Sequence, residues 1–302
     1  EDVVMRLLAN SEPIPLEKLG LAPRNLSRLK SAIAKPYGLF FVCGPTGSGK
    51  TTTLHSVLGH LNTPETKIWT AEDPVEITQK GLRQVQVNRK AGLDFGTMMR
   101  AFLRADPDII MVGEMRDAET VAIGIEASLT GHLVFSTLHT NSAPESVIRL
   151  LDMGMDPFNF ADALLGVLAQ RLAKRLCEKC KQPHDADELE IAHLLDEYCE
   201  DMHETPAFTA NPDAARAAIL ADWRTQFAQE GRFRLFKPVG CPECNGGYKG
   251  RVGLHELMIG SDDIKQAIQE RARAKQLLSM ALADGMRTLR QDGIEKVLAG
   301  IT

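Results

Sequence analysis

The sequence lacks three features that would each define a class of protein. No apolar run approaches the roughly 18 residues that a membrane-spanning helix needs. Aromatic residues make up only 5% of the 302 residues, which argues against the stacking platforms that bind single-stranded nucleic acid. Basic residues are not in excess, because 40 acidic residues oppose 35 basic ones and leave a net charge of −5. This balance argues against a protein that mainly grips phosphate backbones.

Cysteine is also sparse, and four of the six cysteines form two C-x-x-C pairs, Cys177 with Cys180 and Cys241 with Cys244. Such pairs in a long, enzyme-like chain indicate a reducing compartment and a metal rather than disulfides. Two pairs close a tetrahedral Zn²⁺ site without an open position, which would make the metal structural. Sixty residues separate the pairs, but the entropy of loop closure grows only logarithmically with length. The alternative of four free cysteines stays open.

The remaining sequence alternates short apolar segments with helix-length segments, which is typical of βαβ units around a mainly parallel sheet. Beyond about residue 160 the strand signals become rare, and we expect mainly helices. The expected strands are 39–43, 68–70, 109–112 and 133–136. The expected helices are 23–34, 51–61, 162–176, 187–202, one from 212, and two or three in the last forty residues, with stops near Gly285 and Gly300.

Residues 44–51 read GPTGSGKT and fit the phosphate-loop pattern G-x-x-x-x-G-K-[ST]. An expected strand precedes the loop and an expected helix follows it, so backbone N–H groups and the helix N-terminus would face the phosphates. Lys50 would reach the β- and γ-phosphates of ATP, and the Thr51 hydroxyl would bind Mg²⁺. A glycine turn without a ligand is the alternative interpretation. The candidate nucleotide-binding residues are Gly44, Pro45, Thr46, Gly47, Ser48, Gly49, Lys50, Thr51 and Thr52.

Two other expected strands end in acids. The strand 109–112 is followed by Gly113 and Glu114, so Glu114 would act on Mg²⁺, through water. The strand at 68–70 leads to Glu72 and Asp73, after which Pro74 turns the chain away. Ligands of open α/β sheets bind at the carboxyl ends of the strands. Solvated loop carboxylates remain the alternative for both positions.

Four motifs in this order resemble those of the secretion and pilus-assembly traffic ATPases. They are the phosphate loop, residues 70–76 (TAEDPVE), residues 104–117 (RADPDIIMVGEMRD) and residues 129–141 (LTGHLVFSTLHTN). The resemblance runs from about residue 10 to the C-terminus and is interrupted between about 185 and 232.

The resemblance implies an ATP-hydrolysing motor with a RecA-like P-loop core that assembles as a homo-hexamer. Such a motor lies on the cytoplasmic face of the inner membrane and moves platform and docking proteins of a type II secretion or type IV pilus assembly system. A four-cysteine zinc module belongs to the secretion and pilus-extension branch. We expect no nucleic acid, although a RecA-like nucleic-acid motor and a regulatory scaffold remain as alternatives.

The resemblance also implies roles for individual residues. Glu72 would activate the attacking water, and Glu114 would organise Mg²⁺. His132 and His139 fall in a histidine box that senses the γ-phosphate, although His132 could equally be a core residue. Arginines of the family cluster around the nucleotide or cross a subunit boundary, and the matching positions are Arg83, Arg100, Arg104 and Arg116. The four residues that we expect to be catalytic are Glu72, Glu114, His139 and Arg104.

These inferences divide the chain into four parts. The sequence starts at Glu1 rather than with methionine, so we expect a piece of a longer protein that binds ATP, hydrolyses it slowly and stays mostly monomeric. The insert between the cysteine pairs is longer than the resemblance implies. The expected parts are a linker and remnant of a truncated N-terminal domain (1–36), the RecA-like ATPase core (37–176), the four-cysteine zinc module with its helical insert (177–256) and a C-terminal helical region (257–302).

Overall fold

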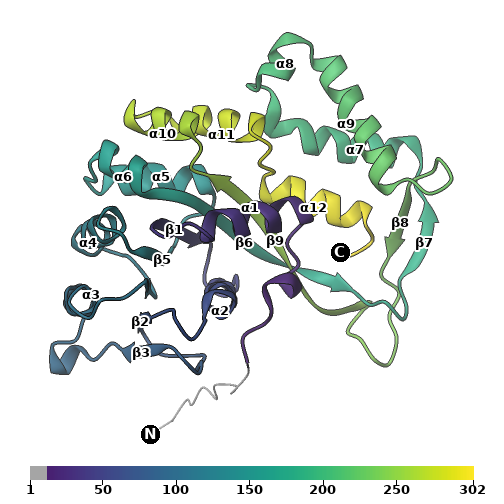
Figure 1. Cartoon of the computed structure of the whole chain (residues 1–302). Coiled ribbons are helices and arrows are strands. Elements are labelled where there is room, and N and C mark those ends of the chain that lie inside the picture. Colours follow the sequence, from purple (N-terminus) through teal and green to yellow (C-terminus); the bar gives the residue numbers. More distant parts are fainter. Residues whose placement is uncertain (1–11) are drawn as a thin grey trace, which may run out of the picture.

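A seven-stranded sheet forms the centre of the protein in the computed structural model, which describes residues 12–302 (Figure 1). Its strand order is β3-β2-β4-β5-β1-β6-β9. Neighbouring strands are parallel except β9, which runs antiparallel to β6, and β7 pairs with β8 in a separate antiparallel sheet. The strands are β1 (Gly38–Cys43), β2 (Ile68–Glu72), β3 (Arg83–Gln86), β4 (Ile109–Val112), β5 (Leu133–Leu138), β6 (Leu164–Leu176), β7 (Gln182–Asp185), β8 (Arg234–Lys237) and β9 (Tyr248–Ile259).

The helices connect these strands as crossovers and add the C-terminal region. The α-helices are α1 (Pro23–Ile33), α2 (Lys50–Leu61), α3 (Phe95–Phe102), α4 (Ala118–Leu129), α5 (Ala143–Asp152), α6 (Pro157–Ala163), α7 (Glu188–Cys199), α8 (Pro206–Ala210), α9 (Pro212–Phe227), α10 (Asp262–Gln269), α11 (Ala274–Ala283) and α12 (Leu289–Leu298). Short 3₁₀ turns occupy η1 (Leu16–Lys18), η2 (Arg89–Ala91) and η3 (Glu200–Met202).

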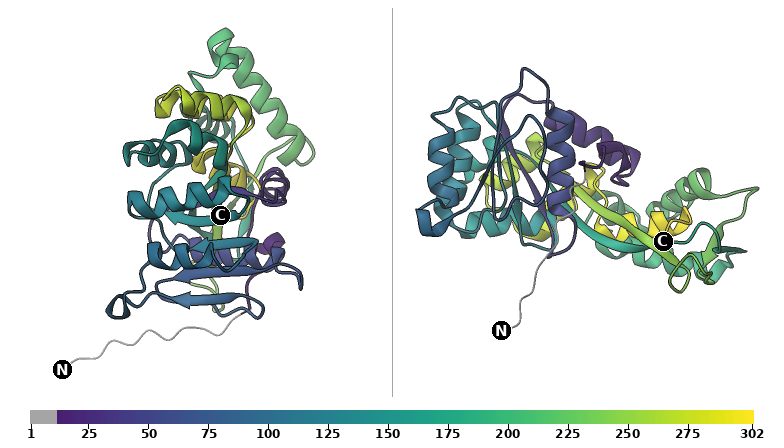
Figure 2. Two further views of the ribbon diagram at one scale, coloured as in Figure 1. Left: turned by 60° about the vertical axis from the view of Figure 1, so that its left-hand side comes forward. Right: turned by 90° about the horizontal axis from the view of Figure 1, so that it is seen from below.

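Helices cover both faces of the sheet, and the central strand β1 shows how. All six of its residues are buried. Leu39 and Phe41 pack into a core with residues of α3 to α6, α10 and α11, while Phe40 and Val42 pack on the other face against η1, α1 and α2. The two layers are visible in Figures 1 and 2. A strand buried on both faces reads as a continuous apolar run, and the expected α/β fold is confirmed.

The expectation of a helix at 162–176 was wrong, because residues 164–176 form strand β6. The segment LLGVLAQRLAKRL is rich in good helix formers, but its first seven residues are all buried between the helical layers. There β6 pairs with β1 on one side and β9 on the other. Tertiary packing and hydrogen bonding on both edges override the intrinsic propensity. Strand β9 was not predicted either, and the expectation that strands become rare beyond residue 160 was wrong.

The long strands β6 and β9 run side by side away from the helical layers (Figure 1). One cysteine pair follows the last residue of β6, and the other shortly precedes the first residue of β9. Antiparallel register pairs Leu176 with Tyr248, and the N–H of Cys177 donates to the carbonyl of Gly247 at 2.9 Å. The two C-x-x-C segments therefore meet although sixty residues separate them in sequence.

The insert between the pairs has its own small core. Tyr198 of α7 meets Trp223 of α9 edge-on, with ring centroids 5.1 Å apart. This core continues onto α12 through Ile294 and Leu298, so the insert is joined to the C-terminal region as well as to the cysteine pairs. Helix α9 begins at Pro212, as expected. Asn211 caps its N-terminus, because its side chain accepts from the N–H of Ala214.

The division of the chain into four parts stays a prediction. The expected boundary after residue 176 coincides with the last residue of β6, whereas the boundary after 256 falls inside β9. Residues 1–11 of the expected linker lie outside the described residues, and the rest of it contributes η1 and α1.

Candidate nucleotide-binding site

The phosphate loop connects the end of β1 to the start of α2. Gly44, Gly47 and Gly49 have φ angles of 147°, 80° and 89°, a region that side-chain-bearing residues avoid. Lys50 folds back onto the loop, where its Nζ donates to the carbonyls of Gly44 at 2.8 Å and Pro45 at 3.1 Å. Burial lowers the pKa of Lys50, and the nearby charge of Glu114 opposes this effect. The ammonium is therefore partly desolvated beside the turn.

Gln170 of β6 supports the loop from the neighbouring strand, and sequence reasoning missed it. Its Nε2 donates to the carbonyl of Ser48 at 2.7 Å, and its Oε1 accepts from the hydroxyl of Thr53 at 2.8 Å. A Cβ on Gly44 would collide with the carbonyl oxygen of Gln170. The Oγ of Ser48 is buried without a hydrogen-bond partner within residues 12–302. Such an orphaned hydroxyl fits a site that receives a polar ligand.

The loop forms one wall of a cavity of about 1300 Å³. Parallel register between β2 and β4 places Glu72 and Glu114 at the same edge of the sheet, where both line this cavity with Lys50 and His139. The N–H of Gly113 donates to the Ala71 carbonyl at 2.8 Å, and a Cβ at this position would lie 3.3 Å from that carbonyl oxygen. The carboxyl ends of three strands thus converge around the phosphate loop.

Glu72 ends β2 and is buried, at 3% exposure. Its Oε1 accepts from the Thr70 hydroxyl at 2.6 Å and from Nε2 of Gln84 at 2.9 Å. Its Oε2 lies 3.1 Å from Nε2 of His55 on α2. Burial raises the pKa of this carboxyl, but the hydrogen bonds from His55, Gln84 and Thr70 outweigh burial and hold the pKa below its ordinary value. Glu72 is therefore an ionised carboxylate at neutral pH.

Glu114 and His139 come from the ends of neighbouring strands and contact each other. Oε1 of Glu114 lies 3.0 Å from Nε2 of His139, and Oε2 pairs with Arg116 at 2.6 Å. The Glu114 side chain is 16% exposed. The Glu114 carboxylate and the His139 imidazole line the same cavity as Lys50. A terminal phosphate bound at Lys50 would carry negative charge that groups in this position could help to neutralise.

The other candidates lie elsewhere. Arg104 is exposed and donates to the carbonyl of Arg100 at 2.9 Å, while Arg100 pairs with Glu119. Arg83 borders a small pocket beside the α2–β2 loop. His132 precedes β5 at the opposite edge of the sheet, where its Nδ1 lies 2.9 Å from the Ala127 carbonyl. Among the four arginines, Arg116 is the one that lines the cavity within the described chain.

The four cysteines of the two pairs form one cluster, with sulfur atoms within 4.8 Å of one another. The Sγ–Sγ distances are 3.9 Å for Cys177 and Cys241, 3.7 Å for Cys180 and Cys244, and 3.6 Å for Cys241 and Cys244. A zinc–sulfur bond of about 2.3 Å gives a tetrahedron with edges of about 3.8 Å. The arrangement therefore fits a four-thiolate metal site.

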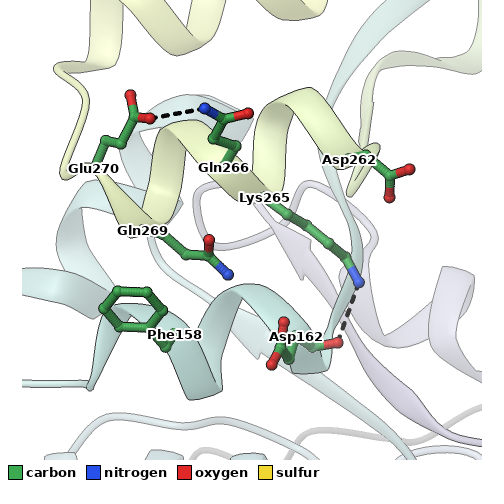
Figure 3. A pocket seen from close by; sticks show the side chains of 7 residues that line it. All are labelled: Phe158, Asp162, Asp262, Lys265, Gln266, Gln269 and Glu270. Atoms are coloured by element: carbon green, nitrogen blue, oxygen red, sulfur yellow. Dashed lines mark hydrogen bonds between the residues drawn. The ribbon is translucent and has the colours of Figure 1, made fainter.

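A second, shallower pocket of about 560 Å³ lies between α6 and α10 (Figure 3). Lys265 of α10 reaches across it to the carbonyl of Asp162 at 3.2 Å, and Gln266 donates to Glu270 at 2.8 Å. None of the candidate site residues lines this pocket. The Lys265 contact joins the two helices and the Gln266 contact lies along α10, so we assign the pocket no ligand.

The phosphate loop between β1 and α2, on a mainly parallel sheet with acids at neighbouring strand ends, defines a P-loop NTPase. The family model "Type II/IV secretion system protein" matches residues 1–302. The chain therefore belongs to the type II/IV secretion system protein family, as the sequence motifs predict.

Curated relatives carry the names of both branches of this family. The chain is 46% identical over 304 residues to "Type IV pilus assembly ATPase PilB" of Thermus thermophilus, covering 100% of this chain and 31% of that protein. It is 44% identical over 304 residues to "Type II secretion system protein E" of Pectobacterium carotovorum, covering 100% of this chain and 54% of that protein. The chain thus spans between about a third and about half of these relatives.

Solved structures share the fold. The pilus retraction motor PilT with bound ADP matches with a TM-score of 0.66 and 27% identity, covering 98% of this chain and 66% of that one. The ATPase DotB of Legionella pneumophila matches with a TM-score of 0.62 and 22% identity, covering 97% of this chain and 63% of that one, which shows similarity of fold.

Proposed function

We propose that this chain is the ATP-hydrolysing region of a motor in a type II secretion or type IV pilus assembly system. The observation that carries the proposal is the cavity in which a complete phosphate loop faces Glu72 and Glu114. The names of the relatives, which include both pilus assembly ATPases and type II secretion proteins, support the same activity. Hydrolysis of ATP to ADP and phosphate would drive the motor.

The residues of the cavity have different roles in phosphoryl transfer, a reaction that depends mainly on positioning and charge neutralisation. Residues 44–52 hold the triphosphate, with Lys50 on the β- and γ-phosphates and the Thr51 hydroxyl on Mg²⁺. Glu114 acts on Mg²⁺ through water, and His139 contacts the terminal phosphate. Glu72 orients the attacking water and accepts a hydrogen bond from it. Mg²⁺, when bound, neutralises phosphate charge.

Arg104 has a different part in this proposal. It is exposed and lies away from the cavity of its own chain, which suits a cation that acts across a subunit boundary. In a homo-hexamer, an arginine delivered by a neighbouring subunit would link hydrolysis to rearrangement of the subunits.

The cysteine cluster holds a structural Zn²⁺ ion in this proposal. The sulfur geometry fits a tetrahedral site with four protein ligands and no open position. The ion would close the far end of the β6–β9 hairpin and hold the insert.

The proposed partners are five further copies of the protein and the platform and docking proteins of the inner membrane, reached from the cytoplasmic side. No helix within residues 12–302 is long and apolar enough to cross a membrane.

ATP hydrolysis by the full-length protein tests the proposal, with Lys50→Ala and Glu72→Gln as variants. Both should reduce kcat by at least about 100-fold, because phosphate and water positioning are lost. Lys50→Ala should also weaken ATP binding, whereas Glu72→Gln should leave it intact. Undiminished turnover in both variants would refute the assignment. Stimulation by DNA that falls steeply with salt would instead favour a nucleic-acid motor.

A further inference from the structure

His55 of α2 is completely buried, at 0% exposure, between Glu72 and Gln79. Its Nε2 lies 3.1 Å from Oε2 of Glu72, and its Nδ1 lies 2.6 Å from Nε2 of Gln79. The same helix begins with Lys50 of the phosphate loop. Both ring nitrogens are engaged, so the orientation of the imidazole is fixed relative to the loop and to Glu72.

Gln79 determines which ring nitrogen carries the proton. Its Nε2 also lies 2.9 Å from the backbone carbonyl of His55. A carbonyl oxygen only accepts hydrogen bonds, so this end of the side-chain amide is the NH₂ group, and it donates to Nδ1 as well. A neutral imidazole that accepts at Nδ1 is protonated at Nε2. His55 therefore donates from Nε2 to Glu72.

The hydrogen bonds around Glu72 leave one oxygen able to accept another. A carboxylate offers about four lone-pair positions, two on each oxygen. Oε1 uses its two for Thr70 and Gln84, whereas within residues 12–302 Oε2 accepts from His55 alone. Glu72 lines the nucleotide cavity. The remaining acceptor position, on Oε2, is thus available to a water molecule.

We propose that His55 is a positioning residue for ATP hydrolysis. Held by Gln79 as the Nε2–H tautomer, it donates to Oε2 and orients the Glu72 carboxylate so that one lone pair of Oε2 stays free for the attacking water. The proton on Nε2 stays on His55 throughout. This inference rests on the proposed function, in which Glu72 contacts that water.

Two substitutions in the full-length protein test the role. His55→Leu removes the donor, and we expect kcat to fall about 10- to 100-fold, the range for a lost hydrogen bond to a charged group. The KM for ATP and the Kd for a non-hydrolysable ATP analogue should not change. His55→Gln places an amide N–H near the position of Nε2 and should restore much of the turnover. Equal turnover in His55→Leu and the unmodified protein would overturn the proposal.

A matched control separates positioning from general damage to α2. Val57 is buried on the same helix, on the core that includes β1. Val57→Ala should lower the thermal stability while leaving kcat unchanged well below its Tm. A comparable fall of kcat in Val57→Ala would show that any loosening of α2 impairs turnover, which would also overturn the specific role of His55.

Failure of this inference can be distinguished from failure of the proposed function. If Glu72→Gln keeps full turnover, the role of Glu72 itself is wrong. If Glu72→Gln is inactive while His55→Leu is fully active, only the role of His55 is wrong. If His55→Leu does not fold, solid-state ¹⁵N NMR of the unmodified protein decides the matter. The His55 signal, assigned by its loss in His55→Gln, should report Nε2–H, and the opposite tautomer or a charged ring would overturn the proposal.

Discussion

Glu256 of β9 is buried and lies between the N-termini of two helices. Its oxygens accept from the N–H of Ala143 at 2.7 Å and of Leu289 at 3.3 Å, the first residues of α5 and α12. Helix α5 follows the segment that carries His139. Glu256 therefore joins the C-terminal region to the edge of the sheet where the nucleotide cavity lies.

The burial of Glu256 predicts a pH-dependent stability. Burial raises its pKa from 4.5 to about 7, although the two backbone N–H groups oppose this. Between these values the folded chain keeps a proton that the unfolded chain has released, so the contribution to stability is lost as pH rises from about 4.5 to 7. One pKa unit corresponds to about 1.4 kcal/mol, so the effect is at most a few kcal/mol.

Chemical denaturation at several pH values measures this contribution. Glu256→Gln cannot ionise, so its free energy of unfolding should fall less between pH 5 and 7 than that of the unmodified protein. Parallel curves for the two proteins would show that Glu256 is ionised in the folded chain across this range.

The sequence predicts some site residues and not others for a physical reason. Lys50, Glu72 and Glu114 belong to local patterns of a strand followed by a loop, and the structure places all three around one cavity. Gln170 and His55 are found only through long-range contacts, since Gln170 meets Ser48 across 122 positions. Their types and neighbours give no local signal of a role. The role proposed for Arg104 involves a second subunit, so neither the local sequence nor a single chain contains the contacts it needs.

Among the secondary-structure elements, strand β6 supports the phosphate loop through Gln170, whose side chain bonds Ser48 and Thr53. Gln170→Leu should weaken the binding of a fluorescent ATP analogue about tenfold, because the Ser48 carbonyl and the Thr53 hydroxyl lose their partner. Gln266→Leu is a matched control, since Gln266 is exposed and its side chain bonds within its own helix. Equal Kd values for the two variants would argue against support of the loop by Gln170.

The elements themselves were predictable where burial follows the local pattern. Strands β1, β2, β4 and β5 are short apolar runs in the sequence. Asn211 and Pro212 are typical residues for the start of a helix, and α9 begins there. Strand β6 was mistaken for a helix because leucine and alanine, which dominate its sequence, are strong helix formers. Its state is decided by pairing with β1 and with β9, which starts 72 residues after β6 ends. A pattern of neighbouring residues cannot show pairing between segments that lie so far apart in the sequence.

For the molecule as a whole, the cysteine cluster lies where the far end of the β6–β9 hairpin meets the insert. We expect one zinc ion per chain by elemental analysis. Cys241→Ser should abolish zinc binding and lower the Tm, because metal binding contributes directly to folding where ligands meet only in the native state. Ser56→Ala, on α2 far along the chain from the cluster, should keep its zinc. Full zinc content in Cys241→Ser would contradict the four-thiolate site.

In the proposed function a triphosphate binds at residues 44–51, with acids from two strand ends facing its terminal phosphate. A crystal structure of the full-length protein with Mg²⁺ and a non-hydrolysable ATP analogue would show these contacts. We expect Lys50 to leave the carbonyls of Gly44 and Pro45 for the phosphates, with Glu114 on the metal side and Glu72 facing a water next to the γ-phosphate. A nucleotide bound elsewhere, or Glu72 and Glu114 turned away from the phosphates, would contradict it.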